Sequence, residues 1–275
     1  MKHPIISATL AAVWFWAGQL AYAIPLHIFI GGTGESTPSY TVNTAVFDGT
    51  NDYLRSTSGG TGFGDTTVFT FSVWLKRAAD GTTQFVANYS TSGPQEHFAV
   101  FLNASNQLRF RASTSAATSG SAVDLTSSVT IVTADGWKHI YLAVNTASSA
   151  ATQLWVNGVE DTSMTETTLT GTIDWTITGN RATIGGNSAV PPTQLFNGSL
   201  AEPWLQDAYL DPSTNLSKFY AGGHPVDVGD NGEIPTGSTP IWYFSSGTVG
   251  LGTWTNNGSA GSWSVTGTLG TDTSP

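Results

Sequence analysis

The chain has 275 residues, and its 19 acidic against 9 basic residues give a formal net charge of -10. This charge repels a phosphate backbone, so we expect no nucleic-acid partner. The absence of cysteine excludes disulfides, thiolate metal sites and a cysteine nucleophile. A hydrophobic content of 39% is sufficient to fill the core of one large β-sandwich.

The first predicted segment is a hydrophobic leader within residues 1–38. Lys2 and His3 precede an apolar run, and Ala21-Tyr22-Ala23 has the small-x-small spacing that a signal peptidase reads. Gly and Gln interrupt this run, which makes it a poor membrane span of roughly 20 apolar residues. Two interpretations stay open. The leader is either an arm that docks into an assembly or an export signal, and only the second predicts contact with a membrane.

Residues 39–225 are predicted to form an all-β domain, because short alternating apolar runs are separated by turn residues. The run at 69–75 is apolar on both faces, which predicts a strand inside a sheet. The Ser-rich and Thr-rich stretch at 113–128 is predicted to be a loop or a weak edge strand. Two antiparallel hairpins are predicted, pairing 98–102 with 108–111 and 140–144 with 153–156.

The pattern changes after residue 225, where Gly and Pro interrupt the chain repeatedly. Apolar residues return around Trp254 and Trp263. Residues 226–275 are therefore predicted to be a β-rich C-terminal extension.

Six short motifs resemble those of laminin-G-like and concanavalin A-like jelly rolls, in order and in spacing. They are VFDGTNDYL at 46–54, FTFSVW at 69–74, GWKHI at 136–140, LWVNGV at 154–159, IGG at 184–186 and FNGSLAE at 196–202. The resemblance covers about residues 40–220. It implies an antiparallel two-sheet jelly-roll sandwich, here with an N-terminal hydrophobic arm and a C-terminal extension.

A second resemblance concerns residues 223–269, which look like the tail of jelly-roll proteins encoded by tailed bacteriophages. It implies a structural protein of the virion surface, either a capsid decoration or a tail-fibre subunit. Such a protein is expected to form a homo-oligomer, to contact other virion subunits and to bind a surface glycan. The alternative is a secreted bacterial lectin-like carbohydrate-binding module.

The distribution of reactive residues argues against an enzyme. Glucanases with this fold place two carboxylates on one strand face, whereas the glutamates of this chain are isolated. No G-x-S-x-G motif accompanies a histidine, so a serine triad is not expected either. We therefore expect a protein that binds without catalysis.

Asp48, Asn51 and Asp52 offer hard oxygen atoms within one turn, and the laminin-G resemblance implies calcium there. The competing interpretation is the stronger one, because Asp is also favoured where its carboxylate caps the amides of a tight turn.

Glycan binding requires an exposed aromatic platform beside polar side chains. Three tryptophans near predicted turns are the candidates for this platform, namely Trp175, Trp204 and Trp254. Other tryptophans lie in predicted strands and are assigned to the core.

Overall fold

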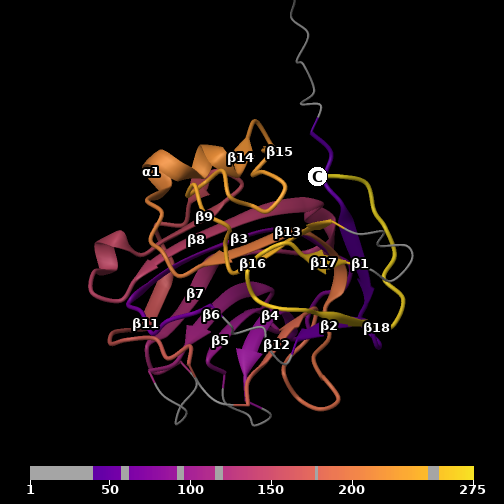
Figure 1. The fold of residues 1–275 in the computed structure, drawn as a ribbon, viewed down its shortest axis with the longest axis horizontal. Coiled ribbons are helices and arrows are strands. Elements are labelled where there is room, and N and C mark those ends of the chain that lie inside the picture. The colour runs from indigo at the N-terminus through magenta and orange to yellow at the C-terminus, as the bar shows by residue number, and fades with distance from the viewer. Residues whose placement is uncertain (1–39, 57–61, 92–95, 115–119, 177–178, 247–253) are drawn as a thin grey trace, which may run out of the picture. The chain divides into compact units, whose positions relative to one another are not determined.

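The computed structural model describes residues 40–56, 62–91, 96–114, 120–176, 179–246 and 254–275 (Figure 1). The chain divides into two units, Met1–Thr37 and Pro38–Pro275. The predicted leader at 1–38 lies outside the described residues. Among the described residues, no helix is long and apolar enough to span a membrane.

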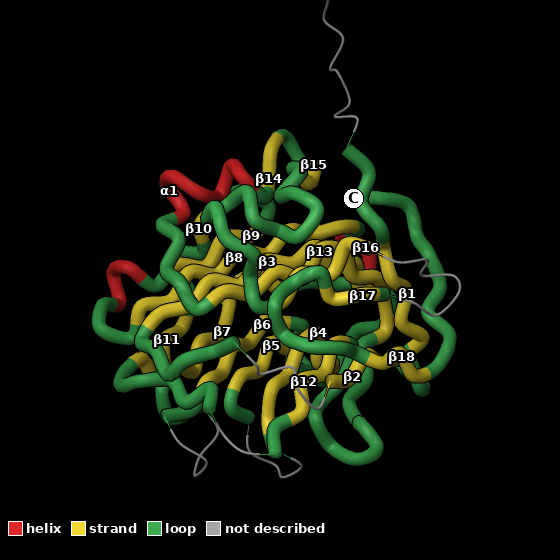
Figure 2. The backbone as a smooth tube through the Cα atoms, viewed as in Figure 1, coloured by secondary structure: helices red, strands yellow, loops and turns green. Residues whose placement is uncertain are grey.

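Two antiparallel sheets of eight strands each form the unit, as the resemblance implied (Figures 1 and 2). Sheet A contains β1 (Thr44–Asp48), β3 (Val68–Arg77), β8 (Trp137–Asn145), β9 (Gln153–Val156), β10 (Val159–Glu160), β13 (Asn197–Gln206), β16 (Trp242–Ser246) and β17 (Thr255–Asn256). Sheet B contains β2 (Tyr53–Ser56), β4 (Gln84–Ser90), β5 (Phe98–Leu102), β6 (Gln107–Ala112), β7 (Val123–Thr130), β11 (Thr165–Leu169), β12 (Arg181–Ile184) and β18 (Ser264–Thr266).

Helical segments are short. They are α1 (Pro212–Asn215), η1 (Thr133–Asp135), η2 (Ser149–Ala151) and η3 (Leu216–Lys218), and a two-stranded ribbon joins β14 (Tyr220–Ala221) to β15 (His224–Pro225). The strand content and the sheet order make the fold a concanavalin A-like jelly-roll sandwich.

The alternating pattern of β3 explains why the sandwich closes. Phe69, Phe71, Val73 and Leu75 face the core between the sheets, whereas Trp74 packs on the outer side of sheet A. The predicted hairpins are confirmed, since β5 pairs with β6 and β8 pairs with β9. The turn after β9 uses Asn157 and Gly158 at positive φ, the conformation that an Asn-Gly dipeptide favours.

One sequence interpretation is corrected. The stretch at 113–128 contains much of β7, which lies between β6 and β11 rather than at an edge. Its Val123 and Leu125 alternate into the core, a signal that the surrounding Ser and Thr masked. Residues 226–275, predicted to be a β-rich C-terminal extension, contribute β16 and β17 to sheet A and β18 to sheet B.

The outer face of sheet A is covered by the chain that leaves β13. Residues 207–236, including α1 and the β14–β15 ribbon, lie above β8 and β9 in Figure 1. Tyr141 donates a hydrogen bond to the Leu210 carbonyl at 2.7 Å, and the Trp204 indole donates to the Gly232 carbonyl at 2.9 Å. This covering segment reaches β16 at its far end and so provides one wall of the pocket described below.

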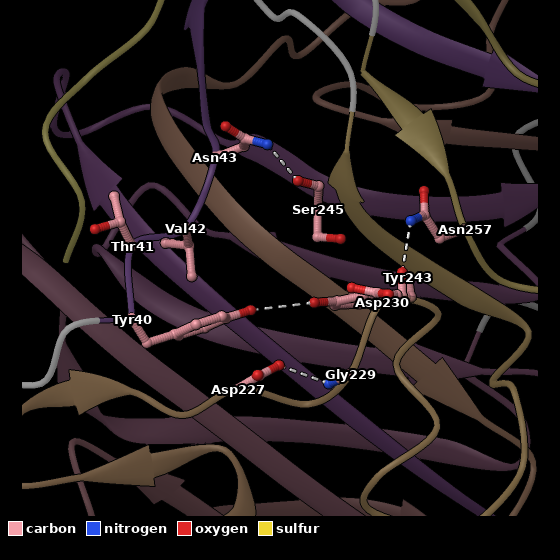
Figure 3. A pocket seen from close by; sticks show the side chains of 10 residues that line it. All are labelled: Tyr40, Thr41, Val42, Asn43, Asp227, Gly229, Asp230, Tyr243, Ser245 and Asn257. Carbon is pink, nitrogen blue, oxygen red and sulfur yellow. Dashed lines mark hydrogen bonds between the residues drawn. The ribbon is translucent and has the colours of Figure 1, made fainter.

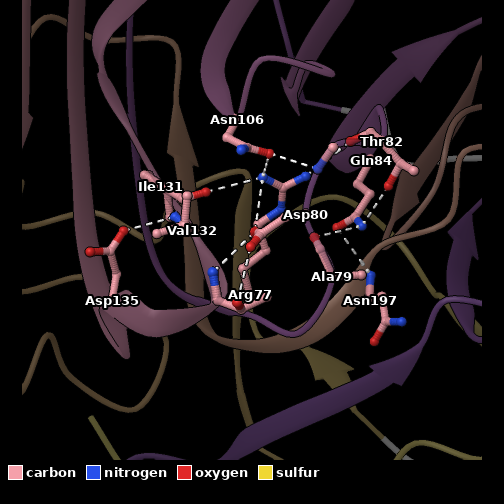
Figure 4. Close-up of polar contacts among 12 residues, drawn as sticks. Arg77, Ala79, Asp80, Thr82, Gln84, Asn106, Ile131, Val132, Asp135 and Asn197 are labelled. Atoms are coloured by element: carbon pink, nitrogen blue, oxygen red, sulfur yellow. Dashed lines mark hydrogen bonds and ion pairs between the residues drawn. The ribbon is translucent and has the colours of Figure 1, made fainter.

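A buried arginine ties the end of β3 to the turn of the β5–β6 hairpin (Figure 4). Arg77 donates to Asn106 Oδ1 at 2.6 Å and to the carbonyls of Ile131 and Thr82, both at 3.0 Å. Asp80 Oδ1 lies 3.7 Å from the same guanidinium. The guanidinium of Arg77 thus makes its contacts within the protein, and we assign this cluster to stabilising the fold.

Candidate functional site

An irregularity in β13 places an acidic side chain on the outer side of sheet A. In a regular strand, side chains on one face are an even number of positions apart, but Leu200 and Leu205, which both face the core, are five apart. The pairing with β3 accordingly shifts register between Ala201 and Trp204. Glu202 lies in this bulge with a φ of 48°, a left-handed value that non-glycine residues rarely adopt. Pro203 follows and has no N–H to donate to a ladder, which suits a bulge.

Two tyrosine hydroxyls hold the Glu202 carboxyl group. Tyr40 donates to Oε1 at 2.5 Å, and Tyr243 donates to the same oxygen at 3.1 Å. The side chain is buried, and its burial raises the pKa of Glu202 to about 7, although both tyrosine hydrogen bonds act in the opposite direction. Strained backbone and a buried acid with a shifted pKa together mark a candidate functional site.

A pocket of about 440 Å³ opens beside these two tyrosines (Figure 3). Three parts of the chain that are distant in sequence line it: the segment before β1, the covering segment on sheet A, and β16 together with the residue that follows β17. The lining residues are Tyr40, Thr41, Val42, Asn43, Asp227, Gly229, Asp230, Tyr243, Ser245 and Asn257.

Hydrogen bonds between the three stretches shape the pocket (Figure 3). Asn43 donates to the Ser245 carbonyl and Asn257 donates to the Asp230 carbonyl, both at 2.6 Å. Asp227 accepts the backbone N–H of Gly229 at 2.9 Å. The Asp230 carboxylate is exposed and, within the described part of the chain, accepts no hydrogen bond from another residue.

The pocket therefore combines tyrosine side chains with two exposed carboxylates and amide groups. Carboxylates accept hydrogen bonds from hydroxyl groups, and aromatic rings pack against the apolar face of a sugar ring. Asp227 and Asp230 also disfavour an anionic ligand. The chemistry suits a neutral ligand rich in hydroxyl groups.

The predicted tryptophan platform is wrong. Trp175, Trp204 and Trp254 are 0%, 1% and 2% exposed. Trp175 stacks on Phe63 with ring centroids 4.2 Å apart, and Trp254 lies in the core beside Phe47. Their positions near turns suggested exposure, but these turns fold inward and the covering segment encloses Trp204.

The predicted calcium ligands do share one turn after β1, but three of their oxygens accept backbone hydrogen bonds. Asp48 Oδ1 accepts the backbone N–H groups of Thr50 and Asn51, at 2.7 and 3.1 Å. The two carboxylate oxygens of Asp52 accept N–H groups from Thr268 and Asp48, at 2.8 and 3.0 Å. Within the described residues, no group of three or more acidic or histidine side chains could hold a metal. This donor set fits turn capping rather than a cation, and calcium stays a prediction.

Sequence reasoning missed the pocket because its residues come from separate segments. Glu202 was noticed only as an isolated acid, although the Glu-Pro pair inside a predicted strand is a signal for a bulge. Nothing local to Tyr40 or Asp230 indicated that they would meet.

Comparisons with solved structures find several that are similar to this chain. No curated protein matches the chain. A Bacteroides ovatus structure, described as a candidate carbohydrate-binding protein, superposes with a TM-score of 0.53 at 12% identity, covering 86% of this chain and 61% of that one. A heptameric SAP-like pentraxin from Limulus polyphemus gives a TM-score of 0.45 at 14% identity, covering 68% and 87%. Domains LG4-5 of the mouse laminin α1 chain give 0.42 at 12% identity, covering 62% and 43%.

The family comparison is more specific than these structural similarities. A family model described as the concanavalin A-like lectin/glucanases superfamily matches residues 48–214. This range contains most strands of both sheets and the bulge at Glu202. Because the match extends over more than half of the chain, the protein belongs to the concanavalin A-like lectin/glucanases superfamily.

Proposed function

We propose that this protein is a non-catalytic glycan-binding module, and that the pocket beside Tyr40 and Tyr243 binds a neutral sugar. The observation that carries the proposal is the meeting of two tyrosines with the exposed carboxylates of Asp227 and Asp230 in one pocket of sugar size. The superfamily includes lectins, which is consistent with this assignment.

The position of Glu202 supports binding rather than hydrolysis. A glycosidase needs two carboxyl groups that flank the scissile bond. Glu202 is not among the pocket-lining residues, and one of its oxygens is engaged by both Tyr40 and Tyr243. We assign it to positioning the two tyrosines. Incubation with a panel of polysaccharides should release no new reducing ends, and their appearance would replace this proposal with an enzymatic one.

The pocket is tested by glycan-array screening followed by calorimetry with the best neutral oligosaccharide. Asp230→Asn keeps the size of the side chain but removes the charged acceptor, so we expect affinity to fall at least tenfold. Glu160→Gln is the matched control, since Glu160 lies on β10, at the opposite end of sheet A from β16 and β17. Equal affinity of Asp230→Asn and the unmodified protein would refute the pocket assignment.

The biological setting is a separate part of the proposal. We place the protein on the virion surface of a tailed phage, as a decoration or tail-fibre homo-oligomer. The resemblance of residues 223–269 to the tail of phage jelly-roll proteins supports this placement. Mass spectrometry of purified virions tests it, and absence of the peptide contradicts it. For the alternative, a secreted bacterial module, N-terminal sequencing should find a mature chain that begins at Ile24, whereas an intact Met1 favours assembly.

A further inference from the structure

The outer face of sheet B carries four of the nine basic residues of this acidic chain. Two of them are paired: Arg109 makes a bidentate contact with Asp124 at 2.8 and 2.7 Å, and Arg111 lies 3.2 Å from Glu96. The other two are Arg55 on β2 and Arg181 on β12. In the described part of the chain, neither forms an ion pair, although the protein has 19 acidic residues.

These two unpaired arginines are neighbours on the same face. Thr183 lies directly opposite Arg55 in the pairing of β12 with β2, and Arg181 precedes Thr183 by two residues. Residues two apart on a strand point to the same side, and the intervening Ala182 faces the core. Burial, and in addition the charge of Arg181, lowers the pKa of Arg55. The sheet thus holds two like charges close together.

Buried polar atoms without partners surround this pair. Arg55 Nε and Arg181 Nη1 are buried and have no hydrogen-bond acceptor. Next in the row across the sheet come Thr183 and Asn88, whose Oγ1 and Oδ1 atoms also lack partners, although the residues are only 0% and 1% exposed. A buried polar atom that nothing satisfies destabilises the fold, and a charged one does so more strongly. Thr183 and Asn88 are closed to solvent, whereas the side chains of Arg55 and Arg181 are partly exposed and can be reached by a ligand.

The guanidinium of Arg55 is already held in place. Its Nη2 donates to the Ala189 carbonyl at 2.6 Å, and its centre lies 5.2 Å from the centroid of the Tyr53 ring. A guanidinium that is oriented before binding loses little entropy when it meets an anion. Planar, bidentate contact with a carboxylate is the interaction for which arginine is best suited.

We infer that Arg55 and Arg181 form a binding site for the carboxylate of an acidic sugar. The site is separate from the acidic pocket on sheet A and takes a ligand of opposite character. That the ligand is a saccharide rests on the glycan-binding function proposed above, whereas the binding of a carboxylate does not.

The experiment titrates the full chain with sodium glucuronate, sodium sulfate and glucose. Arginine Nε–H resonances and calorimetry are the two readouts. Glucuronate should shift the Nε–H signals of Arg55 and Arg181, and glucose should not. Arg55→Gln and Arg181→Gln should each weaken glucuronate binding at least tenfold, as expected for loss of a charged hydrogen bond. Lys138→Gln is the control, because it changes net charge equally on β8 of the other sheet.

Several outcomes would overturn the inference. If Lys138→Gln weakens binding as much as the arginine variants, the attraction is diffuse rather than a site. If sulfate binds and glucuronate does not, the carboxylate assignment is wrong. Should a variant fail to fold, the Nε–H shifts of the unmodified protein decide, and unshifted signals refute the site. Asp230→Asn must leave glucuronate binding unchanged, so failure of the sheet A pocket is distinguishable from failure of this site.

Discussion

Replacing the buried Glu202 by Gln should change how stability depends on pH. Burial raises the pKa of Glu202 from 4.5 to about 7, so the folded protein favours the neutral acid. The stabilisation from this group is complete below the unfolded pKa of 4.5 and is lost as pH rises through about 7. At about 1.36 kcal/mol per pKa unit, the loss amounts to roughly 3 kcal/mol.

Glu202→Gln removes this titration and keeps an oxygen that can accept from Tyr40 and Tyr243. The free energy of unfolding of the variant minus that of the unmodified protein should therefore rise by about 3 kcal/mol between pH 4.5 and 8. The comparison between variant and unmodified protein is needed because two histidines also titrate. Burial lowers the pKa values of His97 and His139, so these residues destabilise the fold as pH falls, which is opposite to the effect of Glu202.

Urea denaturation followed by tryptophan fluorescence, repeated at half-unit pH steps, measures this difference. Glu160→Gln is the control, because it makes the same substitution on β10, at the opposite end of sheet A from β16 and β17. A flat difference for Glu202→Gln would refute the assignment of a raised pKa to this buried carboxyl group.

Three further predictions concern stability. Trp175→Ala should lower the free energy of unfolding by about 3–5 kcal/mol in denaturant titrations, because the indole fills the centre of the core; a loss below 1 kcal/mol would contradict its burial. Arg77→Met should cost about 2–4 kcal/mol by the same assay, since Asn106 Oδ1 and the Ile131 carbonyl lose a donor, and a neutral effect would mean that water replaces it. Adding calcium after chelation should leave the melting temperature unchanged, because backbone N–H groups occupy Asp48 Oδ1 and both Asp52 oxygens; a rise would support the predicted calcium site.

Much of the fold was predictable because its signals are local. The alternating residues of β3, the hairpin of β5 and β6 and the Asn157-Gly158 turn each depend on a few consecutive residues. Strand β7 was missed because a Ser-rich and Thr-rich sequence can form a loop or a strand, and its neighbours β6 and β11 decide between them.

The amino-acid sequence by itself determined the class of fold, the positions of most central strands and the membership of the concanavalin A-like superfamily. Alternation of side chains along a strand and the turn preferences of Asn and Gly act over short distances. Only the tertiary structure decided which aromatic residues are buried and which polar groups meet. The hydroxyls of Tyr40 and Tyr243 lie 3.5 Å apart although 203 positions separate the residues. Likewise, strand register places Arg55 opposite Thr183. Such contacts depend on how the two sheets pair and pack, because burial at one position is set by residues that are remote in the chain.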